Sequence, residues 1–407
     1  MDGMLTARPE DVGLSTARLK KFEAWAEGWV ASGKLPCLTT AVLRHGQVAH
    51  FHMTGMADVE RQVPVAADTI FRFYSMTKPL TSVAIMQLYE DGHFQLDDPI
   101  SRFLPKFANQ RVYVSGSRGK YESVPAERDI NFRDLLSHTS GITYGFMESH
   151  PVDAMYRAAK IDFQTSSKTL GDMVDTLAGL PLICQPGSEW NYSNSTDILG
   201  HLVAVISGRP FDDYLREKVT GPLGMVDTGF VIPPEKLARF SGLYARDADG
   251  KLILMDDAQK SVFAVRRDIV SGGGGLVSTA GDYLRFCRMM LNKGELDGAR
   301  LLGRKTVELM TANHLRGDMA EMGQPRFSES PYYGIGFGLG FSVMLDPAKA
   351  HILGTPGEYA WGGAASTAFW IDPAEDMAVL MLTQLIPSST YPIRREARVL
   401  TYQAIMD

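Results

Sequence analysis

The chain has 407 residues, of which 45% are hydrophobic and 22% are charged, as in an ordinary globular protein. Its formal net charge of −6 gives no reason to expect binding to nucleic acid or to an anionic membrane surface. No apolar run reaches the roughly 18 residues that a membrane-spanning helix needs. A chain of this length predicts two domains, or one large domain with an insertion.

The N-terminal residues and the cysteines bear on the cellular compartment. Met1-Asp2-Gly3-Met4 lacks the basic segment and apolar core of a signal peptide. Three widely spaced cysteines, Cys37, Cys184 and Cys287, include no CxxC pair. This spacing argues against a zinc cluster and a disulfide framework, and it fits a reducing compartment. We therefore expect a cytoplasmic protein.

Apolar periodicity and turn residues predict the first elements. An N-cap serine followed by apolar residues at helical spacing predicts a helix over Ser15–Gly33. Two β-rich stretches, Thr39–Leu43 and Val48–Met53, flank a turn and predict a hairpin. The pattern then becomes helical over Ser75–Glu90, where Asp-Gly ends it.

The rest of the chain divides into a helical middle and a β-rich end. Between residues 96 and 270 we expect mostly helices and long loops, with an exposed loop at Ser115–Lys120. The predicted helices are 171–179, 195–206, 212–218, Ala280–Leu291 and Ile393–Ile405, and the predicted late strands are Phe337–Leu345, Thr367–Ile371 and Met377–Leu382.

Two β-rich ends around a helical middle predict one sheet that is built from both ends of the chain. We therefore expect an α/β (α+β) protein. Residues 1–95 and 271–407 would form a discontinuous sheet domain, and residues 96–270 a mostly helical domain, with the functional site between the two.

The first candidate site is Ser75-Met76-Thr77-Lys78. Residues three apart on a helix lie on nearly the same face, so this spacing places the amine of Lys78 beside the hydroxyl of Ser75. The positive field at a helix N-terminus favours an alkoxide there. A serine becomes nucleophilic when a base takes its proton, and a lysine in its neutral form can be that base. The pair predicts a serine nucleophile.

The same spacing occurs in Ser117-Arg118-Gly119-Lys120. There it lies in a Gly/Ser-rich stretch that has no apolar periodicity and no preceding strand, so we interpret Lys120 as a solvated surface residue. Ser75, by contrast, follows a strand and a turn and precedes an apolar helix. The context therefore favours Ser75.

Two further motifs are candidates, each with a structural alternative. The hydroxyl of Tyr192, in Tyr192-Ser193-Asn194, could relay a proton between nucleophile and leaving group. The alternative is a turn in which Asn194 or Ser195 caps the next helix. Trp361-Gly362-Gly363-Ala364 could let a ligand approach the backbone and could supply an oxyanion-hole N–H. The alternative is a bulge or a tight turn into an edge strand.

Together these motifs resemble the signature of the serine β-lactamases and penicillin-binding proteins: SxxK, then YxN about a hundred residues later, then a Gly-containing triad on a late strand. The resemblance covers about residues 10–400, and it implies a β-lactamase/transpeptidase-like fold with an antiparallel sheet flanked by helices and an all-α insertion. No metal or organic cofactor is implied. Similar supporting stretches are Ile130–Ile142, Gly221–Met225 and Ser271–Thr279.

One departure from that signature bears on the substrate. β-Lactamases and D-alanyl-D-alanine peptidases carry a Lys-Thr/Ser-Gly triad whose cation helps to bind a substrate carboxylate, whereas Trp361-Gly362-Gly363 stands at the matching position. An indole offers an apolar wall instead. The variant is most similar to the family VIII carboxylesterases and to the related statin-type acyltransferases, which implies an uncharged, small-molecule ester with a short to medium acyl chain.

The resemblance also implies roles for the motif residues. Ser75 would be the nucleophile, Lys78 and Tyr192 the base and acid pair, and the amides of Ser75 and Ala364 the oxyanion hole. Asn194 would help to position Lys78 or the substrate. The substrate would also be contacted by Trp361, Gly362 and Gly363. Weak β-lactam hydrolysis, a D-Ala-D-Ala-type peptidase, an acyltransferase and a sensor acylated without turnover remain alternatives; the oligomeric state is not predicted.

Other motifs are interpreted as structural. His50 and His52 share a strand face but lack a third ligand, which favours ordinary strand histidines. We expect a loop-fixing hydrogen bond for His138 and backbone packing for Gly272–Gly275, and no GxSxG elbow is present. The loop aromatics Tyr144, Phe146, Tyr332, Tyr333 and Tyr359 either line an acyl pocket or pack within their loops.

Overall fold

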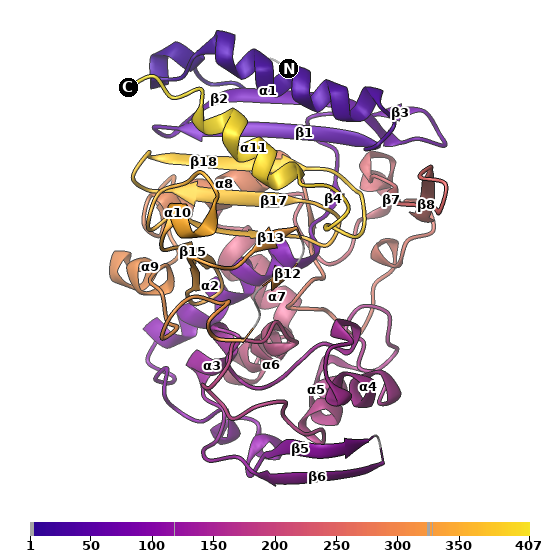
Figure 1. Cartoon of the computed structure of the whole chain (residues 1–407), viewed down its shortest axis with the longest axis vertical. Helices are drawn as coiled ribbons and strands as arrows, with labels where there is room; N and C mark the ends of the chain where they lie inside the picture. The colour runs from indigo at the N-terminus through magenta and orange to yellow at the C-terminus, as the bar shows by residue number, and fades with distance from the viewer. Residues whose placement is uncertain (1–3, 118, 324–325, 328) are drawn as a thin grey trace.

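An eight-stranded antiparallel sheet, built from both ends of the chain, forms the upper part of the molecule (Figure 1). The structure is a computed structural model that describes residues 4–117, 119–323, 326–327 and 329–407. The two ends meet where β1 pairs with β18, with Ala41 opposite Leu380. Across the sheet the strands are β14 (Ile335–Phe337), β15 (Ser342–Met344), β16 (Tyr359–Gly362), β17 (Ala368–Asp372), β18 (Met377–Leu382), β1 (Cys37–Arg44), β2 (Gln47–Asp58) and β3 (Val63–Pro64).

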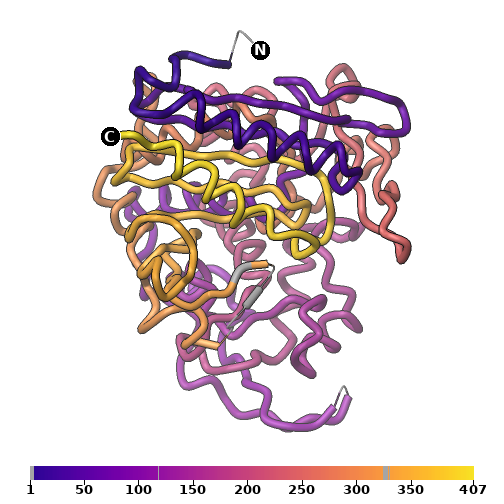
Figure 2. The backbone as a smooth tube through the Cα atoms, turned by 45° about the horizontal axis from the view of Figure 1, so that its top comes forward, coloured from indigo at the N-terminus to yellow at the C-terminus, as the bar shows by residue number. Residues whose placement is uncertain are grey.

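The central strands are buried on both faces because helices cover the sheet on both sides. Every residue of β1 and of β18 is buried. Alternate side chains such as Val42 and Val379 face α1 (Thr16–Ala31) and α11 (Ile393–Tyr402), and Ala41 and Leu380 belong to the core on the opposite face. α8 (Ala280–Leu291) packs on that second face. Figure 2 shows α1 and α11 side by side over the sheet.

Several predicted elements of the sheet region are confirmed. The Ser15 hydroxyl caps α1 by accepting a hydrogen bond from the backbone N–H of Arg18. β1 and β2 form the predicted hairpin, and its turn places His45 and Gly46 in left-handed conformations, with φ angles of 50° and 72°. α8 and β18 have the bounds expected from their apolar patterns.

Helices and long loops make up most of the middle of the chain, as expected, but it also contains two hairpins that were not predicted, so this region is not all-α. Ser115–Lys120, expected to be an exposed loop, belongs to the hairpin of β5 (Arg111–Ser117) and β6 (Lys120–Pro125), with Arg118 outside the described residues. β7 (Leu243–Arg246) pairs with β8 (Leu252–Asp256). The helices are α3 (Phe132–Leu136), α4 (Pro151–Ala158), α5 (Leu170–Ala178), α6 (Ser195–Ser207), α7 (Phe211–Leu215) and the π-helical turn Arg216–Thr220.

The middle and the sheet region share one apolar core, since Leu199 and Leu202 of α6 and Phe369 of β17 belong to the same buried cluster. α2 (Thr77–Glu90) lies between them and contacts α6. The proposed division into two domains stays a prediction.

The remaining elements are β4 (Phe71–Arg72), β9 (Val277–Ser278), β10 (Glu295–Leu296), β11 (Ala299–Arg300), β12 (Arg326–Phe327), β13 (Ser330–Pro331), α9 (Arg304–Met310) and α10 (Pro347–Ala350).

Near the C-terminus one prediction was wrong in detail and one strand was missed. The predicted strand Phe337–Leu345 is two strands, β14 and β15, because the chain turns between them at Gly340, whose φ is 103°. Strand β16 was not predicted as a strand, since two of the residues around its end are glycines, which have low strand propensity. It lies between β15 and β17 rather than at an edge.

Within the described ranges, no helix combines the length and the apolar character needed to cross a bilayer. The three cysteines are buried and form no disulfide. Among the same residues, no group of three or more His, Cys, Asp and Glu side chains could hold a metal ion.

His50 is part of the packing between β2 and α1. Its side chain is 3% exposed, its Nε2 lies 2.9 Å from the Thr40 hydroxyl, and its ring stacks on Phe22 with centroids 5.3 Å apart. Burial, with a smaller contribution from His52, lowers the pKa of His50 to about 3. The folded protein therefore holds this imidazole in its neutral form.

We expect His50 to make the protein less stable in acid. The unfolded chain takes up a proton on this ring near pH 6.5, but the folded chain does so only near pH 3, so stability falls as the pH is lowered through that window. The loss is at most about 1.4 kcal/mol per pH unit. In His50→Gln the free energy of unfolding, measured by urea denaturation, should decline less between pH 7 and pH 5, by up to about 2 kcal/mol. Equal declines in the two proteins would contradict this account.

Candidate active site

Ser75 lies in a 3₁₀ turn, Tyr74–Met76, directly before α2. The start of a helix presents free N–H groups and a positive dipole end, which favour negative charge on the Ser75 oxygen. Tyr74 adopts a left-handed conformation with a φ of 43°, an uncommon state for a residue other than glycine. The Tyr283 hydroxyl of α8 donates to the Met76 carbonyl at 2.9 Å and so holds the turn in place.

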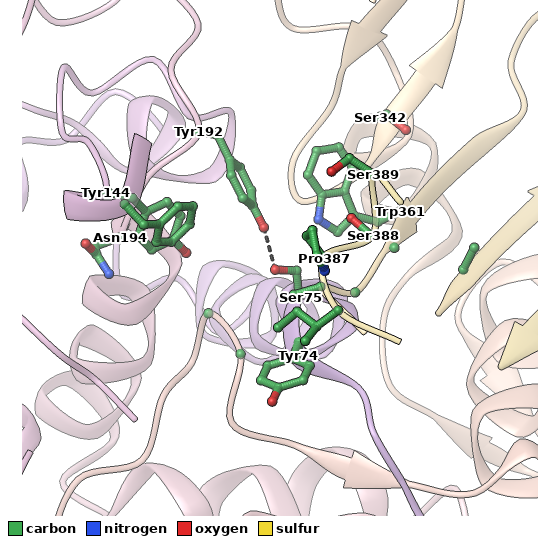
Figure 3. Close-up of a pocket in the computed structure, with 18 of the residues that line it drawn as sticks. Tyr74, Ser75, Tyr144, Tyr192, Asn194, Ser342, Trp361, Pro387, Ser388 and Ser389 are labelled. Atoms are coloured by element: carbon green, nitrogen blue, oxygen red, sulfur yellow. Dashed lines mark hydrogen bonds between the residues drawn. The ribbon is translucent and has the colours of Figure 1, made fainter. Parts of the chain in front are cut away.

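Two of the predicted partners lie at the Ser75 hydroxyl, and Figure 3 shows one of them, Tyr192. The Tyr192 hydroxyl donates to Ser75 Oγ at 2.5 Å, and Lys78 Nζ donates to the same atom at 3.3 Å. The Lys78 ammonium also lies 4.6 Å from the centre of the Tyr192 ring. The structure therefore brings Ser75, Lys78 and Tyr192 together, whereas exposed Ser117 and Lys120 lie on the β5–β6 hairpin.

Lys78 is 1% exposed and has two further acceptors, which the sequence analysis did not identify. Its Nζ donates to the Tyr144 hydroxyl at 3.0 Å and to the Gly273 carbonyl at 2.7 Å. Three acceptors match the three N–H donors of an ammonium group. Burial, with smaller contributions from Tyr192 and Asp197, raises the pKa of Tyr144 well above its usual value, so Tyr144 keeps its proton.

Gly272 and Gly273 pack against α6, as expected for this glycine run. A Cβ on Gly272 would lie 2.6 Å from the Thr196 carbonyl oxygen, and one on Gly273 would lie 2.8 Å from the Asp197 carboxylate. The absence of side chains therefore lets the segment approach α6, where it presents the Gly273 carbonyl to Lys78.

Asn194 faces the cavity but has no hydrogen bond to Lys78. Its Nδ2 donates to Asp197 at 3.0 Å, and Asp197 accepts in turn from the Gly273 N–H at 2.9 Å. Asn194 therefore supports the segment that holds Lys78 only through Asp197 and Gly273. The alternative role as a side-chain cap is not observed, because Asn194 precedes α6 without a capping hydrogen bond from its side chain.

His138 supports the loop that carries Tyr192. Its Nδ1 lies 3.0 Å from the Ser193 hydroxyl, which is the expected loop-fixing hydrogen bond, and its ring centre lies 5.2 Å from that of Tyr192. Burial, assisted by the charge of Lys78, lowers the pKa of His138 well below its usual value. This neutral ring lies beside Tyr192.

Trp361, Gly362, Gly363 and Ala364 line the same cavity as Ser75. The two glycines make room for protein atoms rather than for a ligand: a Cβ on Gly362 would lie 2.8 Å from the Arg394 guanidinium, and one on Gly363 would lie 2.3 Å from the Phe73 carbonyl oxygen. Trp361 forms the expected aromatic wall, with its ring centre 5.4 Å from that of Tyr192.

Arg394, at the start of α11, is a cavity residue that the sequence analysis missed. Its Nη2 donates to the carbonyls of Gly363 at 2.8 Å and of Thr367 at 2.9 Å, and its backbone N–H donates to Glu329 at 2.9 Å. Burial raises the pKa of Glu329 to about 7. No local signal marks Arg394, because its position depends on where α11 packs against the sheet.

The cavity has a volume of about 810 Å³ and reaches from the helical region, past Ser75, to the sheet and α11. Three of the five loop aromatics line this cavity, as one of the two alternatives predicted: Tyr144, Phe146 and Tyr332. Tyr333 is instead exposed, and Tyr359 is buried in β16. Its other apolar lining residues include Ile161, Phe163, Ile335, Met344, Ile352, Phe369, Trp370 and Ile386.

A helix-start serine bonded to a lysine and a tyrosine, between an antiparallel sheet and a helical region, defines the class of serine enzymes with a β-lactamase/transpeptidase-like fold. The sequence model of the beta-lactamase family matches residues 22–403 of this chain. The chain belongs to this family.

Relatives and solved structures agree with this assignment. An uncharacterized protein of Mycobacterium tuberculosis is 36% identical over 360 residues, which are 88% of this chain and 87% of the relative. Esterase EstB of Burkholderia gladioli is 32% identical over 361 residues, 84% of each chain. The structure of EstCE1, described as a hydrolase with promiscuous acyltransferase activity, has a TM-score of 0.78 and 26% identity, and the alignment covers 95% of this chain and 99% of EstCE1.

We expect Gly363→Ala to damage the site. The added methyl group would collide with the Phe73 carbonyl and the Thr367 hydroxyl, each 2.3 Å from its position, so the backbone next to Ser75 would have to move. The substitution should cost about 1–3 kcal/mol of stability. It should also lower kcat/KM for an ester by about tenfold or more.

The matched control is Gly28→Ala, because a Cβ at Gly28 on α1 meets no atom within 4 Å. Alanine there should leave activity unchanged and stabilise the helix by up to about 1 kcal/mol. Urea denaturation and ester kinetics measure both variants. Wild-type kinetics in Gly363→Ala would show that this contact does not position the site.

Proposed function

We propose that the protein is a carboxylesterase that hydrolyses esters through an acyl-enzyme on Ser75. The single observation that carries this proposal is the position of the Ser75 hydroxyl, 2.5 Å from the Tyr192 hydroxyl and 3.3 Å from Lys78 Nζ, in the wall of a largely apolar cavity. Esterase EstB, 32% identical, supports the same activity.

In the acylation step, Ser75 Oγ attacks the ester carbonyl and forms the C–O bond, while the Lys78/Tyr192 pair takes the hydroxyl proton. To accept it, the pair starts the step one proton short of an ammonium plus a protonated phenol. The carbonyl oxygen becomes an oxyanion, which the backbone N–H groups of Ser75 and Ala364 stabilise. Collapse of this intermediate breaks the bond to the alcohol oxygen. The same pair returns the proton to that oxygen, and the alcohol leaves.

In the deacylation step, water attacks the carbonyl carbon of the acyl-enzyme and gives a proton to the Lys78/Tyr192 pair. The bond to Ser75 Oγ then breaks, the serine regains its proton, and a carboxylic acid leaves. The two steps consume one ester and one water. They need no oxidant, reductant or cofactor.

We propose uncharged esters with short to medium acyl chains as substrates. Trp361 stands where the resembled β-lactamases carry a cation, and the cavity wall is mostly apolar. Arg394, a cation in that wall, donates to two backbone carbonyls. The three buried cysteines, which form no disulfide, support a reducing, cytoplasmic location.

Acyl transfer is the second candidate function. A cavity of about 810 Å³ has room for an alcohol acceptor beside a short acyl group, and EstCE1 is described as a hydrolase with promiscuous acyltransferase activity. The acceptor would then replace water in the second step, so that the acyl group passes to the acceptor oxygen and not to hydroxide.

We expect Ser75→Ala to reduce kcat for a short-chain aryl ester by about 10⁴-fold or more, because the variant has no nucleophile. Ser117→Ala is the matched control: it removes the serine of the other SxxK pair, on the exposed hairpin, and should leave kcat within about twofold of wild type. A continuous assay of phenol release measures both variants. Substantial activity in Ser75→Ala would overturn the proposed nucleophile.

Mass spectrometry separates an enzyme from a sensor acylated without turnover. We expect wild type to release many equivalents of phenol per chain and to carry an acyl adduct on Ser75 only transiently. A persistent adduct after a single equivalent would overturn the esterase and support the sensor. The same experiment with a chromogenic cephalosporin reports β-lactam turnover.

We expect an added short-chain alcohol to divert part of the product from free acid to a new ester, in proportion to its concentration. Both products come from one acyl-enzyme, so the rate of phenol release should stay nearly constant when acylation limits the rate. Chromatography of acid and ester measures the partition. If free acid is the sole product at molar concentrations of alcohol, the transferase function is contradicted and the esterase function is retained.

A further inference from the structure

We propose that Arg394 is a positioning residue that orients and polarises the backbone amide of Ala364 for stabilising the oxyanion. The inference rests on the proposed function, because it takes the Ala364 N–H as an oxyanion-hole donor. Arg394 touches no reacting atom in this scheme. It acts through the peptide group that joins Gly363 to Ala364.

The Gly363 carbonyl and the Ala364 N–H belong to one planar peptide group. In a trans peptide the two bonds point in opposite directions, so a donor that fixes the carbonyl also fixes the direction of the N–H. Arg394 Nη2 lies 2.8 Å from the Gly363 oxygen. The Ala364 N–H must therefore point away from the guanidinium, and Ala364 lines the cavity that contains Ser75.

The hydrogen bonds of this turn leave the Ala364 N–H as a donor to the cavity. The Gly363 N–H donates to the Thr367 carbonyl at 2.9 Å, and the Ser366 N–H donates to the Gly363 carbonyl at 3.1 Å. Among the described residues, the Ala364 N–H has no backbone or side-chain acceptor. A backbone donor in this state suits an anionic oxygen of a bound substrate.

The two glycines hold this peptide between the guanidinium and the nucleophile segment. The missing Cβ of Gly362 leaves the space that the Arg394 guanidinium occupies, and the missing Cβ of Gly363 lets Phe73, two residues before Ser75, approach with its carbonyl. Arg394 Nη2 also donates to Thr367 at 2.9 Å and so closes the turn on its second side. Trp361, in β16 directly before the two glycines, lines the same cavity as Ser75 (Figure 3).

The charge of Arg394 adds a second effect. A cationic donor on a carbonyl draws electron density from the peptide, which makes the N–H of the same group a stronger donor. Negative charge develops on the substrate oxygen only in the transition state and the tetrahedral intermediate. Loss of Arg394 should therefore lower kcat while KM stays nearly constant.

The test compares Arg394→Met, which removes the guanidinium but keeps an unbranched side chain, with Arg395→Met on the next residue of α11. Arg395 Nη2 donates to the His351 carbonyl, outside the cavity. For an aryl ester we expect kcat to fall about 10- to 100-fold in Arg394→Met, with KM within about twofold. Arg395→Met should keep both constants within about twofold of wild type.

Inhibition by an alkylboronic acid provides a second measurement, which would stay unchanged if Arg394 had only a structural role. The boron of this acid forms a tetrahedral anion on Ser75 Oγ, and one boron-bound oxygen occupies the oxyanion position. We expect its inhibition constant to rise in Arg394→Met by about the same factor as kcat falls. Unchanged kcat and boronate inhibition in Arg394→Met would overturn the proposal, and so would equal losses in Arg395→Met.

Arg394→Lys keeps the proposal testable if Arg394→Met fails to fold. A lysine keeps the charge but lacks the planar fork, so it reproduces the contact only in part. We expect kcat to fall about 3- to 10-fold, with a parallel rise in the boronate inhibition constant. Wild-type values for both would overturn the inference. Formation of the Ser75 adduct in wild type tests the proposed function separately. If no adduct forms, the proposed function is wrong. If the adduct forms but the Arg394 variants behave like wild type, only the present inference is wrong.

Discussion

The buried amine of Lys78 donates to three acceptors that come from three distant parts of the chain: Ser75 on its own turn, Tyr144 in the middle region and Gly273 before α8. A buried ammonium is costly unless its donors are satisfied, so these segments must pack together for the amine to be accommodated. The contact with Ser75 and the approach of the glycine segment to α6 both serve that requirement, and the Tyr192 ring centre lies 4.6 Å from the same amine.

The site is built largely by backbone contacts at two glycine pairs. Gly272 and Gly273 bring a carbonyl to Lys78, and Gly362 and Gly363 bring the end of β16 to Phe73 and Arg394. The first pair packs against α6, and the second packs against Phe73 and Arg394. A methyl group at these positions would collide with a carbonyl, a carboxylate or a guanidinium, so close packing at both pairs holds the segments around Ser75.

Local rules predicted the parts of the site that local geometry determines. Ser75 and Lys78 follow from helical spacing, and Tyr192 was found because its motif keeps a recognisable order along the chain. Arg394, Tyr144 and the Gly273 carbonyl were missed as contacts, because their positions depend on tertiary packing between segments far apart in sequence. β16 was missed for another reason: a four-residue strand that ends in glycine carries too little alternation to be recognised. The sheet from both chain ends was predicted correctly, since β1 is rich in apolar and β-branched residues and β18 is a continuous apolar run.

The cavity wall differs in kind from the hydrogen-bonded group of Ser75, Lys78 and Tyr192. Phe146, Ile161, Met344 and Ile352 line the cavity, and none of them has a hydrogen bond or ring contact with Ser75 or Lys78 in the part of the chain that the structure describes. Replacing these side chains would change the shape of the cavity and leave the hydrogen bonds of Ser75 and Lys78 in place. Mutations in the wall can therefore change which substrate the cavity accepts while the contacts of Ser75 and Lys78 are kept, so that specificity can evolve without an inactive intermediate.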